Sequence, residues 1–145
     1  MKKIDCILLV DDDSTTNFLN SELISDLNIC NQVHVAHNGQ EALNYIKLEG
    51  EYKGVDKKLN IRPNLIFLDI NMPLMDGFEF LKEYKLLPKS KRANCMIVFL
   101  TTSDAVKDKI KSEANELIYE FIEKPLRKDD LLAIVEEYFR KKIQT

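Results

Sequence analysis

The fold of this chain is constrained above all by a regular alternation of short apolar runs with amphipathic segments. Three runs, "CILLV", "LIFL" and "MIVFL", are apolar throughout, which is typical of strands buried on both faces of a sheet. "QVHVA" alternates and predicts a more exposed strand. Because helix-like segments separate the strands, the sequence predicts a parallel sheet covered by helices on both faces, a (βα)5 α/β fold. The expected strands are 6–10, 32–36, 65–68, 96–100 and 119–123.

Apolar residues at helical spacing predict the helices between these strands. Asp13 or Ser14 can cap the first helix, because a short side-chain oxygen accepts a hydrogen bond from a free backbone N–H. Phe18, Leu19, Leu23 and Leu27 recur at helical spacing in the first helix, and Ala42, Leu43 and Ile46 face inward in the second. The later helices are expected from Phe78 to before Pro88, over roughly 104–114 and over 128–142.

Length and composition indicate a single domain over residues 1–145. A net charge of −3 gives no basic footprint for nucleic acid, and no apolar run is long enough to span a membrane. Cys6, Cys30 and Cys95 lie far apart without a Cys-x-x-Cys pair, which argues against a disulfide framework and against a zinc site. We expect a cytoplasmic protein whose partners include neither nucleic acid nor a membrane.

Chemically active side chains follow the carboxyl ends of four expected strands. In "LIFLDINMPLMDG" a buried run leads directly into Asp69 and then into a turn. Asp11 and Asp12 follow the first strand, Thr101 follows the fourth, and Lys124 follows the fifth. Ligands of open parallel sheets bind beyond the carboxyl ends of the strands, so these side chains are expected to converge.

The converging set predicts a cation site and a phosphoryl acceptor. Two unit charges about 4 Å apart repel by ~4 kcal/mol at an effective dielectric near 20, so three carboxylates need a cation. Mg²⁺ accepts carboxylates together with water and phosphate oxygens, and the carbonyl of Asn71 is a further candidate ligand. An aspartate is a competent nucleophile toward phosphorus. Lys124 and Mg²⁺ would then stabilise charge on the transferring group, while the Thr101 hydroxyl donates a hydrogen bond to it.

In the order and spacing of "ILLVDDDST", "LIFLDINMPLMDG", "VFLTTS" and "FIEKPL", the chain resembles the receiver domain of two-component response regulators. The resemblance implies a flavodoxin-like fold with strand order 2-1-3-4-5. It implies that Asp69 is the phosphoacceptor and that Asp12, Asp69 and the Asn71 carbonyl hold Mg²⁺ with help from Asp11. It also makes Lys124 the counter-charge of the phosphoryl group.

The same resemblance assigns Thr101 and Phe121 to a conformational switch, and it aligns Pro125 with a proline that follows a cis peptide bond. The phosphodonor would be a sensor histidine kinase or a histidine phosphotransfer protein, which docks near the first helix and the loop after Lys124. Nothing but a few residues follows the last expected helix, so we expect a stand-alone receiver without an output domain. It would be a monomer or weak homodimer that signals to a downstream protein and catalyses only its own phosphorylation and dephosphorylation.

Three features depart from the family pattern. Thr102 stands where a smaller residue is common, which narrows access to the phosphoryl group. The loop at 49–63 is long and charged, and the stretch "SEANELIYE" lacks the usual glycine. His34 is expected to face solvent and His37 to lie in a turn, and neither is expected to donate phosphoryl groups.

Two other functions fit parts of the sequence. "DDDST" matches the D-x-D-x-T pattern of haloacid dehalogenase-like phosphatases, with Asp11 as nucleophile and Asp13 as acid. That interpretation leaves "DINMPLMDG" without a role. A receiver-like scaffold that binds partners without being phosphorylated is the third possibility, and an intact set of acids, threonine and lysine argues against it.

Overall fold

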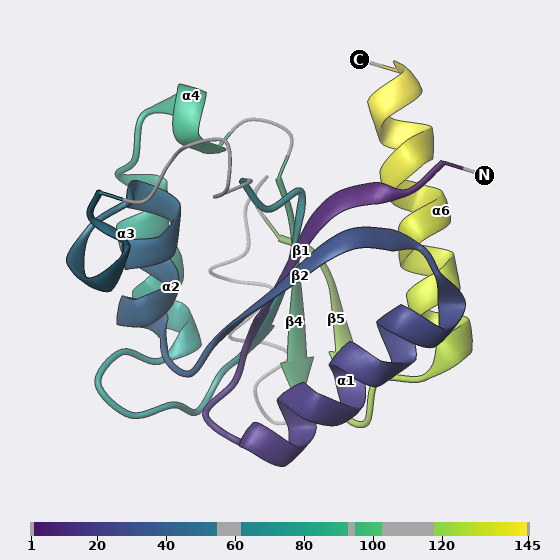
Figure 1. Cartoon of the computed structure of the whole chain (residues 1–145), viewed down its shortest axis with the longest axis horizontal. Helices are drawn as coiled ribbons and strands as arrows, with labels where there is room; N and C mark the ends of the chain where they lie inside the picture. Colours follow the sequence, from purple (N-terminus) through teal and green to yellow (C-terminus); the bar gives the residue numbers. More distant parts are fainter. Residues whose placement is uncertain (1, 55–61, 93–94, 103–117, 145) are drawn as a thin grey trace.

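A parallel sheet of five strands forms the centre of the molecule (Figure 1). The computed structural model describes residues 2–54, 62–92, 95–102 and 118–144. The strand order is β2-β1-β3-β4-β5 and every neighbouring pair is parallel, so the predicted fold and strand order are confirmed. The strands are β1 (Ile4–Val10), β2 (Cys30–Ala36), β3 (Leu65–Asp69), β4 (Met96–Thr101) and β5 (Ile118–Glu123).

Helices cover both faces of this sheet, with α1 and α6 on one face and α2 and α3 on the other (Figure 1). The helices are α1 (Ser14–Leu27), α2 (Gly39–Lys47), η1 (a 3-10 turn, Gly50–Tyr52), α3 (Gly77–Lys85), α4 (Lys89–Arg92) and α6 (Lys128–Gln144). The sequence predicted neither η1 nor α4, each of which is a single turn. The helix expected over 104–114 lies outside the described residues.

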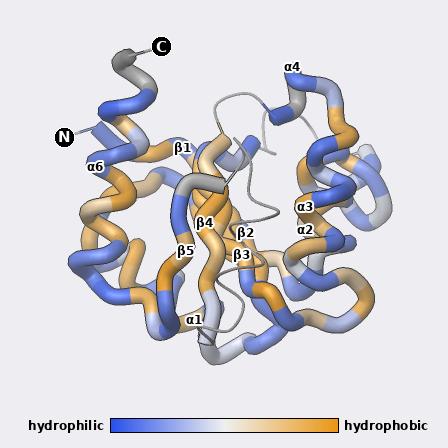
Figure 2. Tube along the Cα trace, turned by 180° about the vertical axis from the view of Figure 1, so that it is seen from behind, coloured by the Kyte–Doolittle hydropathy of each residue, from blue (hydrophilic) through white to orange (hydrophobic). Residues whose placement is uncertain are grey.

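The core consists of two apolar layers, one on each face of the sheet. Successive side chains of a strand point to opposite faces, so Leu8 and Val10 pack against α2 and α3, while Ile7 and Leu9 pack toward α1 and α6. Figure 2 shows hydrophobic residues along the central strands and hydrophilic residues on the outer turns. Within the described part of the chain, no helix is long and apolar enough to cross a membrane.

Helix α1 buries only part of its apolar residues, since Leu23 and Leu27 pack against the core but Phe18 and Leu19 do not. Asp13 caps it by accepting a hydrogen bond from the Thr15 N–H, as predicted. Its buried residues are Asn17, Asn20 and Ile24, however, whereas Phe18 and Leu19 are 62% and 59% exposed. The asparagines lie inward because the helix begins beside the polar end of β1, where the Asn17 amide bonds the main chain.

The prediction that His34 faces solvent was wrong. Its ring stacks on Tyr45 of α2 with centroids 3.9 Å apart, and its Nε2 lies 2.7 Å from the hydroxyl of Tyr52. Tyr52 belongs to η1, which folds over β2 and covers the ring. Burial lowers the pKa of His34. His37 does lie in a turn, where it pairs with Glu41.

Gly77 allows helix α3 to begin directly against the end of β3. A Cβ at this position would lie 2.6 Å from the carbonyl oxygen of Asp69 and 3.0 Å from the Phe99 ring. The Gly77 N–H donates to the carbonyl of Ile70 at 2.8 Å, which closes the loop after Asp69. The position of Asp69 therefore depends on the lack of a side chain at Gly77, eight residues further along the sequence.

Replacing Gly77 with alanine is expected to lower the free energy of unfolding by about 2 kcal/mol, because backbone and a buried ring must shift to admit the methyl group. Urea unfolding followed by circular dichroism measures the loss. Gly54→Ala is the comparison for backbone strain without a clash, since no atom lies within 4 Å of its Cβ position but its φ of +85° opposes the change; it should lose less stability than Gly77→Ala. A Gly77→Ala protein as stable as wild type would contradict the close approach.

Candidate functional site

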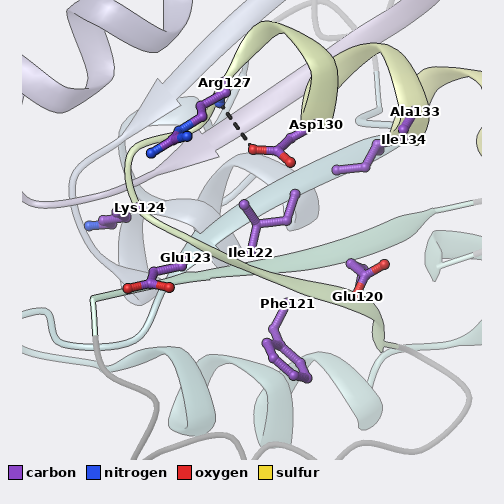
Figure 3. Close-up of a pocket in the computed structure, with 9 residues that line it drawn as sticks. All are labelled: Glu120, Phe121, Ile122, Glu123, Lys124, Arg127, Asp130, Ala133 and Ile134. Atoms are coloured by element: carbon purple, nitrogen blue, oxygen red, sulfur yellow. Dashed lines mark hydrogen bonds between the residues drawn. The ribbon is translucent and has the colours of Figure 1, made fainter.

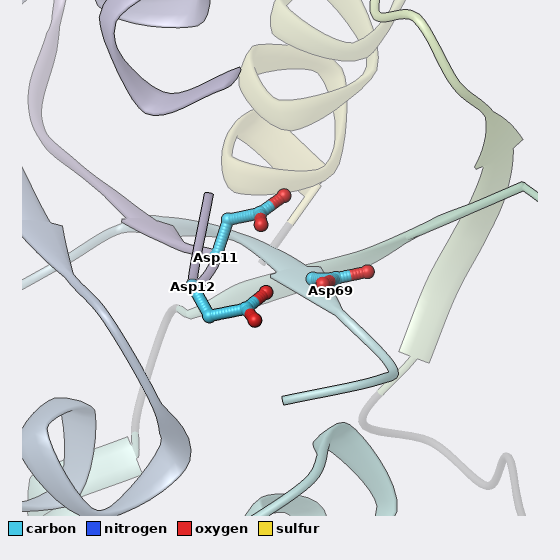
Figure 4. A group of neighbouring side chains, drawn as sticks. All are labelled: Asp11, Asp12 and Asp69. Atoms are coloured by element: carbon cyan, nitrogen blue, oxygen red, sulfur yellow. The ribbon is translucent and has the colours of Figure 1, made fainter. Parts of the chain in front are cut away.

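Three carboxylates meet at the carboxyl edge of the sheet (Figure 4). Asp69 is the last residue of β3, and Asp11 and Asp12 directly follow β1, which pairs with β3. One oxygen from each of the three lies within 4.8 Å of the others. Asp11 and Asp69 are buried, whereas Asp12 is exposed. We call these three residues the acidic cluster.

Lys124 joins two members of the acidic cluster. Its Nζ lies 2.7 Å from Oδ2 of Asp11 and 3.0 Å from Oδ1 of Asp69. The lysine follows β5, and its backbone N–H donates to the carbonyl of Thr101 at 2.8 Å. The ammonium group therefore reaches from the edge strand β5 to the ends of β1 and β3. The peptide bond between Lys124 and Pro125 is cis.

One ammonium does not balance three carboxylates. Burial raises the pKa of Asp69, although its contact with Lys124 acts in the opposite direction. Burial alone would lower the pKa of Lys124, but its hydrogen bonds to Asp11 and Asp69 together raise it. The lysine is therefore held charged, and net negative charge stays on the cluster. Its all-oxygen donor set fits a hard divalent cation such as Mg²⁺.

The hydrogen bonds of Asp69 are concentrated on one of its two oxygens. Oδ1 accepts from the Ile70 N–H at 2.9 Å and faces Lys124. Among the described residues, Oδ2 has no hydrogen-bond donor. On the Asp11 side chain, Oδ1 accepts from the Asp13 N–H and Oδ2 from Lys124. Asp69 is thus the cluster member that combines burial with an oxygen available for reaction.

The other predicted site residues lie near this edge in different settings. Thr101 ends β4 and is buried, and β4 pairs with β3 so that Leu100 lies opposite Asp69. Asn71 is exposed in the loop after β3. Phe121 is half-buried and packs against the core layer of α2 and α3. Figure 3 shows its ring on the side of β5 opposite to Ile122, whose side chain points toward Ile134 of α6.

Two grooves flank Lys124. One, of about 600 Å³, lies between β5 and α6 and is the one drawn in Figure 3. The other, of about 470 Å³, lies between α1 and the loop after β5. Its walls are largely apolar and continue into the exposed side of α1. This second groove is lined by Thr16, Leu19, Asn20, Leu23, Lys124, Pro125 and Leu126.

Sequence reasoning missed Asn17. Its side-chain amide donates to the carbonyl oxygen of Asp11 at 2.8 Å, so it contacts the main chain of the acidic cluster. The available signal was a pair of asparagines three residues apart in a helix, since Asn17 and Asn20 share one face. Hydrophobic spacing does not register this contact, because it records only apolar residues.

A parallel α/β sheet that carries clustered acids and a lysine at its carboxyl edge defines the class as a flavodoxin-like protein with a polar site at its strand ends. Comparison with protein families makes the identification specific: residues 7–136 match the response regulator receiver domain, and the chain belongs to that family. The match is 130 residues long, and it includes Asp11, Asp12, Asp69, Thr101 and Lys124.

Individual relatives agree with this assignment. The chain is 37% identical over 106 residues to response regulator Rcp1 of Synechocystis, covering 73% of this chain and 67% of Rcp1. It is 34% identical over 140 residues to hybrid signal transduction histidine kinase B of Dictyostelium discoideum, covering 90% of this chain but only 6% of that protein. The crystal structure of a two-component response regulator from Cytophaga hutchinsonii superposes with a TM-score of 0.79 at 28% identity, covering 96% and 99% of the two chains.

The charge imbalance predicts opposite effects of two substitutions on stability in EDTA at pH 7. Lys124→Met leaves two buried carboxylates without their cation and is expected to lower the free energy of unfolding by about 3 kcal/mol. Asp12→Asn removes an unpaired charge from the cluster and is expected to raise it by up to about 1 kcal/mol. Urea unfolding measures both changes.

Lys82→Met, which removes an exposed lysine of α3, is the matched control and should change stability by less than about 0.5 kcal/mol. If Asp12→Asn destabilised the metal-free protein, the repulsion inferred from the geometry would be refuted.

Proposed function

We propose that this chain is the phosphoacceptor of a two-component system, with Asp69 as the residue that takes the phosphoryl group. The observation that carries the proposal is the bridge of Lys124 between Asp11 and Asp69. It holds a cation beside the one buried carboxylate that keeps an oxygen without a hydrogen-bond donor among the described residues. Membership of the receiver family supports the same function.

Each residue of the site has a separate role in phosphoryl transfer. Oδ2 of Asp69 attacks phosphorus, a new O–P bond forms, and the bond from phosphorus to the donor's histidine nitrogen breaks. The Lys124 ammonium pairs with the phosphoryl oxygens as charge develops on them. When bound by Asp11, Asp12, Asp69 and the Asn71 carbonyl, Mg²⁺ would supply positive charge that offsets the carboxylates. Burial of Asp69 restricts the approach of water to the acyl phosphate.

Phosphorylation would then be transmitted through the edge of the sheet. The new phosphoryl group attracts the hydroxyl of Thr101, and movement of Thr101 gives Phe121 on the neighbouring strand room to turn inward. Thr101 and Glu123 are paired across β4 and β5, two residues from Phe121. Such a change is a shift between two existing populations, biased by the added charge. A downstream protein partner would read the altered surface, and no enzymatic activity beyond self-phosphorylation and dephosphorylation is proposed.

The exposed apolar side of α1 fits a phosphodonor. Leu19 lines the groove that ends at Lys124, and Phe18, the preceding residue of α1, is also exposed, so a partner docked there lies next to the acidic cluster. We propose a histidine kinase or a histidine phosphotransfer protein as this partner. The name of one relative, a hybrid signal transduction histidine kinase, joins a segment like this chain to a kinase.

Acetyl phosphate with Mg²⁺ is expected to phosphorylate the wild-type chain at Asp69. Reduction of the acyl phosphate with borotritide followed by peptide mapping identifies the residue, and Asp69→Asn should remain unlabelled. Label at Asp11 would favour the phosphatase interpretation instead. An unlabelled wild-type chain, together with unchanged partner binding by Asp69→Asn, would favour a scaffold.

Replacing Phe18 and Leu19 together with serine is expected to slow phosphotransfer about tenfold from a radiolabelled histidine kinase that phosphorylates the wild-type chain, because two apolar anchors are lost. The rate with acetyl phosphate should stay the same, since this small donor needs no docking surface. Leu86→Ser, at an exposed leucine that directly follows α3, is the control. Equal kinase rates for the double variant and wild type would exclude α1 as the docking surface.

A further inference from the structure

Asn17 is a buried polar residue on a helix face that ordinarily carries apolar side chains. It is 3% exposed, and it lies four residues into α1, where that helix packs against the end of β1. Its Nδ2 donates to the carbonyl oxygen of Asp11 at 2.8 Å, a bond between buried groups six residues apart. Since a carbonyl oxygen only accepts, this contact fixes the orientation of the amide and places the Asn17 Oδ1 on the other side.

The side chain of Asn17 holds the peptide that precedes Asp12. The side-chain amide holds the carbonyl of Asp11, and the backbone N–H of Asn17 donates to the carbonyl of Asp13 at 3.1 Å. The backbone bond is the ordinary first-turn bond of the helix, whereas the side-chain bond depends on Asn17 and fixes the carbonyl that precedes Asp12. The N–H of Asp11 is separately bound to the carbonyl of Ala36, so the backbone of Asp11 is held on both sides.

Asp12 depends on this backbone support more than the other two acids do. The carboxylates of Asp11 and Asp69 are oriented by Lys124 and by backbone N–H groups. The exposed carboxylate of Asp12 forms no hydrogen bond or ion pair with the described residues. Its position therefore depends on the main chain, which sets the direction of the Cα–Cβ bond. Rotation of the peptide unit between Asp11 and Asp12 would carry that carboxylate away from the cluster.

The other end of the Asn17 amide reduces what the residue contributes to stability. Its Oδ1 is buried without a hydrogen-bond partner among the described residues. An unpaired buried oxygen is destabilising; an apolar side chain of similar shape would avoid it but would leave the buried carbonyl of Asp11 without its donor. The Asn17 Nδ2 thus donates a hydrogen bond while the Oδ1 of the same amide stays unpaired. Such a cost is expected where the donated bond positions a functional group.

We propose that Asn17 is a positioning residue that holds the Asp11–Asp12 peptide so that the Asp12 carboxylate faces a divalent cation in the acidic cluster. This inference rests on the proposed function, because it concerns the same site. It assigns to Asn17 no contact with the cation or with phosphorus. Its action is limited to the main chain that precedes Asp12.

The test compares Asn17→Leu with wild type in two measurements. Binding of Mn²⁺ alone, followed by electron paramagnetic resonance of the free ion, should weaken about tenfold, as is typical when a group that orients a metal ligand is removed. The urea midpoint in EDTA should fall only modestly, because the buried carbonyl of Asp11 loses its donor while the unpaired Oδ1 is removed. A merely structural role would lower the urea midpoint and leave the Mn²⁺ affinity of the folded protein unchanged.

Asn20→Leu is the matched control, because Asn20 is buried on the same helix face and bonds none of residues 11–13. Its Mn²⁺ affinity should stay within about twofold of wild type. The proposal is overturned if Asn17→Leu binds Mn²⁺ as tightly as wild type, or if Asn20→Leu loses as much affinity. Should the leucine variant fail to fold, Asn17→Ala takes its place under the same criteria. Absence of Mn²⁺ binding by wild type would refute the proposed function itself.

Discussion

The structure depends on an electrostatic imbalance: three carboxylates and one ammonium group share the carboxyl edge of a buried sheet. Lys124 offsets part of the repulsion by contacting Asp11 and Asp69, and Asp12 adds a further charge from the exposed side. Such an arrangement costs stability in the absence of a cation. A site of this kind is consistent with a function that needs a divalent ion and an anionic phosphoryl group at the same place. The positive charge of the ion offsets the negative charge of the carboxylates and of the phosphoryl group.

The parallel fold is what brings these groups together. Residues 11, 69 and 124 are far apart along the chain, yet β1 and β3 are neighbours and β5 is separated from β3 only by β4. Parallel strands present all their carboxyl ends at one edge, so each βα connection delivers its first residues there. Close packing then sets the details. Gly77 lets the loop after Asp69 turn back against β3, and Asn17 ties α1 to the main chain of Asp11.

Much of this arrangement was predictable from the sequence, for a definite reason. Continuous apolar runs followed by acids, a threonine and a lysine define both the strands and their functional ends, and the structure places Asp11, Asp12, Asp69 and Lys124 together as that pattern indicated. The strand order and the family were also predicted correctly. The roles of Thr101, Asn71 and Phe121 remain predictions, since they concern states with a bound ion or phosphoryl group.

What the sequence did not reveal depends on contacts between distant segments. Asn17 lies on the inward side of α1 and bonds the main chain of Asp11, a contact that hydrophobic spacing does not register. His34 is covered because Tyr45 and Tyr52 fold over it, although its strand pattern alone indicates an exposed position. The isomer of the bond before Pro125 is likewise a property of the folded chain.

The central claim, that the carboxylates form one site for a divalent cation, is tested most directly by thermal unfolding in increasing Mg²⁺ at constant ionic strength. Binding to the folded state alone stabilises by RT ln(1 + [Mg²⁺]/Kd), or about 2.7 kcal/mol at a hundredfold excess over Kd. The unfolding midpoint should therefore rise with the logarithm of Mg²⁺ concentration, while Na⁺ of matched ionic strength leaves it nearly constant. A midpoint that responds equally to the two salts would show that only general screening acts on these charges, and it would contradict the account.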